Sequence, residues 1–70
     1  MNNALIAVDQ QAIVCRVLRE GWEWQVKFKG SYWTARAVDA ETRFRLHERV
    51  YVVGRQNIVL LIQPVVKQEW

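Results

Sequence analysis

Residues whose side chains could do chemistry are few and isolated in this chain. Its 70 residues include one cysteine, Cys15, and one histidine, His47. Cys15 lies in the apolar run Ala12 to Leu18, where a small packing residue is expected and no general base is a sequence neighbour. A general-base role for His47 needs a positioned partner, and no serine, cysteine or second carboxylate stands at a recognisable spacing from it. We therefore predict a structural cysteine, a surface-loop histidine and no enzyme activity.

Metal and cofactor chemistry are also disfavoured. A tetrahedral zinc site needs three or four cysteine, histidine or carboxylate ligands, and Cys15 with His47 cannot complete that set alone. The sequence accordingly predicts no metal site, no cofactor and no small-molecule substrate. A single cysteine also excludes an intramolecular disulfide and agrees with a reducing compartment.

No segment has the length and apolar character of a membrane span. No apolar run, Ile58 to Ile62 included, exceeds five residues, far short of the roughly 18 that a spanning helix needs. Residues 1–8 lack the positive region that begins a secretory signal. We expect a cytoplasmic chain, peripheral to a membrane only through a partner.

Turn signals divide the chain into short strand-like runs rich in valine, isoleucine and aromatic residues. A longer connection, residues 39–48, separates the third run from the fourth, and its composition predicts one helical turn at residues 39–42. Five strands with one long connection are typical of a small closed or nearly closed β-barrel. The predicted strands are Ala12–Leu18, Trp22–Phe28, Tyr32–Val38, Arg49–Val53 and Ile58–Gln63.

The clearest of these signals is the segment from Trp24 to Arg36, which alternates apolar and polar residues on both sides of Gly30. That pattern predicts a β-hairpin with an apolar inner face and a polar outer face, because successive strand side chains point to opposite sides. The candidate binding surface is the outer face, which consists of Lys27, Lys29, Tyr32, Thr34 and Arg36. The predicted core consists of Val14, Val17, Trp24, Val26, Phe28, Trp33, Ala35, Val50, Val52, Leu60 and Ile62.

The series Val26-x-Phe28-x-Gly30-x-x-Trp33-x-Ala35-Arg36, followed by Val50-x-Val52-Val53-Gly54 and Leu60-x-Ile62-x-Pro64, resembles the C-terminal domain of the NfeD family. The resemblance implies an all-β fold, a small five-stranded OB-fold (Greek-key) β-barrel over residues 12–64. Residues 1–11 would then be an N-terminal extension and residues 65–70 a C-terminal tail.

The same resemblance implies a non-catalytic protein-interaction or assembly module, since the family domain usually follows membrane helices and is linked with stomatin- and prohibitin-type partners. The chain departs from the family pattern around Gly21, where a Pro-x-Gly turn is reduced to its glycine, and the membrane helices are not part of this sequence. Self-association is a second expectation. Val59 and Leu61, on the outer face, and Trp70, in the tail, are the candidate partner contacts.

Single-stranded nucleic acid is the alternative partner. The span from Lys27 to Arg55 holds seven basic residues against three acidic ones, a net charge of +4. OB-folds bind single strands on the face of strands 2 and 3, with cations and stacking aromatics. The predicted outer face is basic, but Tyr32 is its only aromatic residue. A basic strand face also protects against edge pairing and keeps a small domain soluble, and we therefore favour the protein partner.

Overall fold

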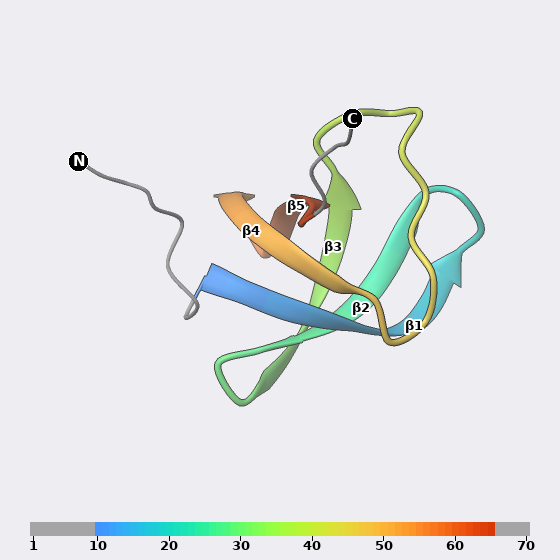
Figure 1. Cartoon of the computed structure of the whole chain (residues 1–70). Helices are drawn as coiled ribbons and strands as arrows, with labels where there is room; N and C mark the ends of the chain where they lie inside the picture. Colours follow the sequence, from blue (N-terminus) through green and yellow to red (C-terminus); the bar gives the residue numbers. More distant parts are fainter. Residues whose placement is uncertain (1–9, 66–70) are drawn as a thin grey trace.

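Residues 10–65, which the computed structural model describes, form a closed barrel of five strands (Figure 1). The hydrogen-bonded order around the barrel is β1–β2–β3–β5–β4, and β4 pairs again with β1. The all-β, five-stranded barrel predicted from the sequence is confirmed. Its strands are β1 (Gln11–Arg19), β2 (Glu23–Phe28), β3 (Ser31–Ala37), β4 (Arg49–Gln56) and β5 (Val59–Pro64).

Residues 1–9 and 66–70, which hold most of the predicted extension and tail, lie outside the described part of the chain. The candidate contact Trp70 is among them. The proposed division of the chain into extension, barrel and tail stays a prediction.

The barrel closes through one parallel pairing, between β3 and β5. Its register places Thr34 beside Val59 and Arg36 beside Leu61, and the Val38 amide donates to the Ile62 carbonyl at 3.0 Å just beyond it. All other pairings are antiparallel. Because parallel neighbours run in the same direction, the turns that precede β3 and β5 lie at the same end of the barrel.

Tight turns lead into both strands. Lys29 and Gly30 connect β2 to β3 with φ angles of 52° and 83°, and positive values at both central residues are the signature of a type I′ hairpin turn. Asn57 and Ile58 connect β4 to β5, with Asn57 at a φ of 61°. The fourth predicted strand, Arg49–Val53, therefore ended too early, since β4 continues to Gln56 through a register shift between Val52 and Gly54.

The connection between β3 and β4 contains turns in place of the expected helical turn. The Asp39 carboxylate accepts a hydrogen bond from the Glu41 amide at 3.0 Å, and the Asp39 carbonyl accepts from the Thr42 amide at 3.0 Å. Such side-chain bonds compete with helix formation. The connection then runs beside β1 (Figure 1), where the His47 amide donates to the Val14 carbonyl at 2.7 Å.

The core is built around Trp24, the largest fully buried side chain. Phe44, from the long connection, is 6% exposed and meets the Trp24 ring edge-to-face, with centroids 5.0 Å apart and planes at 87°. Phe44 was absent from the predicted core, because two arginines flank it in a segment without strand alternation. The buried residues are Ala12, Val14, Trp24, Val26, Ala35, Phe44, Val50, Leu60 and Ile62, with Phe28, Trp33, Ala37 and Val52 packed partly against them.

Val17 was wrongly assigned to the core. It pairs with Trp24 in register, but its side chain is 39% exposed. β1 has register shifts between Val14 and Arg16 and again between Val17 and Arg19. Bulges of this kind bend and twist a strand, and every residue of β1 from Arg16 onward is exposed. The β1–β2 hairpin therefore extends past the packed interior.

We expect Phe44→Ala to lower the free energy of unfolding by about 3–5 kcal/mol, the usual cost of truncating a buried phenylalanine. That is comparable to the roughly 3–5 kcal/mol that so small a core supplies in total, so the variant should be largely unfolded. Leu46→Ala, at a 51% exposed position of the same connection, should change stability by less than about 0.5 kcal/mol. Urea unfolding followed by tryptophan fluorescence measures both, and equal losses would show that Phe44 does not complete the core.

The glycines at positions 30 and 54 should respond differently to alanine. Gly30 has a φ of +83° and open space around it, so Gly30→Ala should cost about 1–2 kcal/mol through left-handed backbone strain alone. Gly54 has no such φ, and an added Cβ would lie 3.5 Å from the Leu61 Cδ1, an ordinary contact. Gly54→Ala should leave stability unchanged or raise it by about 0.5 kcal/mol. The midpoint of urea unfolding measures the stability of each variant. A loss of stability in Gly54→Ala as large as that in Gly30→Ala would contradict the expected difference.

Candidate functional site

Cys15 and His47, the residues with potential for catalysis, share no side-chain hydrogen bond in the described part of the chain, although the His47 amide bonds to the carbonyl of Val14, next to Cys15. Cys15 lies half-buried at a bulge of β1, with its Sγ 3.5 Å from the Ile13 carbonyl oxygen. His47 is exposed in the loop before β4, at a φ of 71°. Within residues 10–65, no three histidine, cysteine or acidic side chains gather in a way that could hold a metal ion.

The outer face of β2, β3 and β5 brings together four of the five residues in the predicted binding surface. Register pairs Lys27 with Tyr32, at the end of β3 nearest its turn. Thr34 lies in the middle and Arg36 at the far end of the strand. Tyr32 is 61% exposed, and the Lys27 ammonium lies 5.6 Å from the centroid of its ring. This cation–π contact holds the two side chains against each other.

Arg36 is held by its neighbours on this face. Its Nε and one terminal nitrogen donate to the same Glu23 carboxylate oxygen, at 3.0 and 2.7 Å. The guanidinium also lies 5.3 Å from the centroid of the Trp22 ring. Arg19 approaches the other Glu23 oxygen at 3.8 Å. Glu23, which the sequence analysis did not single out, therefore offsets positive charge at this end of the face.

Val59 and Leu61 continue the same face onto β5. Parallel register places Val59 beside Thr34 and Leu61 beside Arg36, and both apolar side chains are half-buried. We name the surface made by these neighbours the β3–β5 face. It consists of Tyr32, Thr34, Arg36, Val59 and Leu61.

Lys29 lies elsewhere. It occupies the turn between β2 and β3, and its ammonium lies 5.3 Å from the centroid of the Phe28 ring. The alternation of apolar and polar residues predicted that Lys29 shares the outer face with Lys27. β2 ends at Phe28, however, so Lys29 belongs to the turn and not to a strand face. Its side chain instead lines an open cavity of about 350 Å³ at the end of the barrel.

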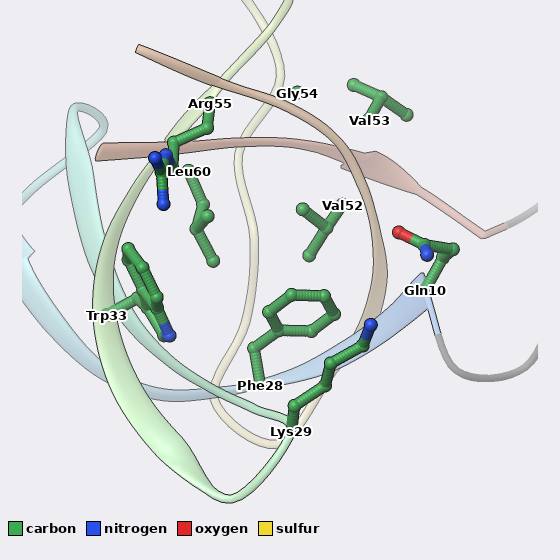
Figure 2. A pocket seen from close by; sticks show the side chains of 9 residues that line it. All are labelled: Gln10, Phe28, Lys29, Trp33, Val52, Val53, Gly54, Arg55 and Leu60. Atoms are coloured by element: carbon green, nitrogen blue, oxygen red, sulfur yellow. The ribbon is translucent and has the colours of Figure 1, made fainter. Parts of the chain in front are cut away.

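We name this cavity the mouth. Phe28, Trp33, Val52 and Leu60 converge on it from four strands, while Lys29 and Arg55 lie on different sides of it (Figure 2). The Arg55 guanidinium lies 5.8 Å from the centroid of the Trp33 ring. Arg55 reaches the inner side because the bulge in β4 pairs it with the inward-facing Leu60. A register shift of this kind leaves no signal in the alternation, which is why sequence reasoning did not find the mouth.

The family model for the NfeD-like C-terminal, partner-binding domain matches residues 6–64. The chain belongs to the NfeD family. The resemblance drawn from the hairpin and strand motifs is thus confirmed, and the family description makes this NfeD domain a protein-interaction module that binds a partner.

A solved structure supports the same assignment. The barrel is similar to the soluble domain of a membrane protein implicated in regulation of membrane protease activity from Corynebacterium glutamicum. The two share 26% sequence identity with a TM-score of 0.72, over 81% of this chain and 89% of the other. A search of curated proteins finds no match. Among the described residues of this chain, no helix is long and apolar enough to cross a membrane.

Proposed function

We propose that this NfeD domain is a non-catalytic module that binds a membrane-associated protein of the stomatin or prohibitin type through the β3–β5 face. The composition of that face is the observation that carries the proposal. An exposed tyrosine, Tyr32, and two apolar side chains, Val59 and Leu61, share it with an arginine that Glu23 already pairs. Aromatic and arginine side chains are enriched in protein interfaces. The structural relative, a domain of a membrane protein, supports a membrane-associated partner.

Nucleic acid fits this face less well. Single-strand binding needs cations free to meet phosphates and several exposed aromatic rings on which bases stack. Arg36 is committed to Glu23, and Trp24 and Trp33 lie on the inner side of the hairpin. Within residues 10–65, Tyr32 is the one aromatic ring among the residues of the β3–β5 face, and the exposed Trp22 ring at its edge lies against the Arg36 guanidinium.

We expect Tyr32→Ala to weaken binding to a stomatin- or prohibitin-type protein from the same organism about tenfold, the loss typical of an exposed aromatic anchor in an interface. Biolayer interferometry with the immobilised partner measures it. Leu46→Ala, which removes an exposed apolar side chain from the connection, is the matched control and should bind as the unmodified chain does. Absence of binding by the unmodified chain would refute the proposed partner class, and equal affinities for both variants would refute the proposed face.

The charge on the face provides a separate test against nucleic acid. Glu23→Gln removes the carboxylate that offsets Arg36 and Arg19. A face that binds phosphates should then bind a labelled single-stranded oligonucleotide more tightly, and salt should weaken that binding steeply. We expect no micromolar binding by the unmodified chain even at low salt, and no gain in Glu23→Gln. Salt-sensitive binding that Lys27→Ala and Arg36→Ala abolish would instead establish the nucleic-acid function.

A further inference from the structure

We propose that the mouth of the barrel is a second contact site, which takes an acidic segment of the protein partner with one apolar side chain inserted among Phe28, Trp33 and Leu60. This inference rests on the proposed function, since it assumes a protein partner. It adds a separate binding site, with an apolar floor and a cationic rim, to the β3–β5 face. Its basis is the charge and shape of the mouth.

The floor of the mouth is apolar. Phe28, Trp33 and Val52 are only partly buried against the core, and their remaining surface faces the cavity (Figure 2). The volume of about 350 Å³ lies near the lower end of the about 300–1,000 Å³ that ligand sites span. Such a cavity has room for an inserted side chain.

The rim of the mouth is cationic. Lys29 and Arg55 are its charged lining residues, and none of the acidic side chains within residues 10–65 lines it. The ion pairs formed within residues 10–65 are those of Glu23 with Arg19 and Arg36, so neither rim cation has a described carboxylate partner. Each instead lies over an aromatic ring of the floor, at 5.3 and 5.8 Å. The rings hold both charges at the edge of an apolar hollow, which complements an acidic segment that carries an apolar residue.

The position of the mouth also favours a protein segment over a small ligand. Ile58 is 74% exposed at the tip of the hairpin whose strands supply Arg55 and Leu60. Val53, 44% exposed, lies in the same hairpin and lines the mouth. Exposed apolar side chains beside a cavity extend the contact area beyond what a small molecule would cover. The mouth and its flanking hairpin therefore form one surface that a chain segment can follow.

The direct test is a nuclear magnetic resonance titration of the full chain with a capped peptide in which one phenylalanine stands between two pairs of acidic residues. We expect shifts in the Trp33 indole N–H signal and in the Phe28, Lys29 and Arg55 amide signals. A peptide with alanine in place of phenylalanine, and one with lysines in place of the acidic residues, should bind at least several-fold more weakly. The double variant Lys29→Gln/Arg55→Gln should lose most of the affinity. Arg16→Gln/Arg49→Gln, which removes the same charge from exposed positions on β1 and β4, should retain it.

The same two double variants, tested against the immobilised partner, separate this inference from the proposed function. Weaker partner binding by Lys29→Gln/Arg55→Gln alone supports the mouth as a contact site. If the partner binds both double variants equally and the acidic peptide leaves the Trp33 signal unchanged, the mouth is not a contact and the proposed function stands. If the peptide binds at the mouth and the partner does not bind at all, the proposed partner class is refuted, whereas the mouth is supported as a site for an acidic segment. An oligonucleotide that shifts the Trp33 signal when the peptide does not would overturn the inference.

Discussion

The parallel pairing of β3 with β5 is the constraint on which the rest of this structure depends. A chain of this size buries only about 60% of the surface that its unfolded form exposes, so it can leave few backbone groups unpaired. With β3 joined to β5, every strand has a hydrogen-bonded neighbour on both sides. The seam between β1 and β4 has a three-residue register, and the bonds between Val14 and the loop at residues 47–48 extend it. Closure thus removes the exposed edges that invite aggregation.

The same pairing creates both candidate surfaces. Parallel register aligns the outward residues of β3 with those of β5, which brings Val59 and Leu61 next to Thr34 and Arg36. It also places the β2–β3 and β4–β5 turns at one end of the barrel, where they enclose the mouth with Lys29 and Arg55 on its rim. The long connection makes this topology feasible, because the chain must return along β1 before β4 and β5 can form. On that path it contributes Phe44 to the core.

Sequence reasoning succeeded where alternation is uninterrupted and failed where a bulge or a long-range contact intervenes. The inward and outward sides of β2 and β3 were predictable because these strands pair without a register shift. The bulge in β4 changed the outcome for Arg55, since one extra residue alters which side chains face inward. Val17 pairs with Trp24 but is exposed, because the bulged end of β1 extends past the packed interior. Phe44 could not be assigned from local pattern, because its burial depends on Trp24, which is distant in sequence. The mouth was not predictable for the same reason, as its lining comes from several strands.

The partners of the basic residues distinguish charge that serves the fold from charge that is available for binding. Arg36 and Arg19 converge on Glu23 at the start of β2, so this part of the positive charge is offset within the domain. A net charge of +4 over residues 27–55 therefore overstates how basic the β3–β5 face is. Lys29 and Arg55 contact aromatic rings, which hold them in place without neutralising them. Because a cation over a ring keeps its full charge, the mouth carries two cations that no described carboxylate offsets, whereas Glu23 offsets Arg36 on the β3–β5 face.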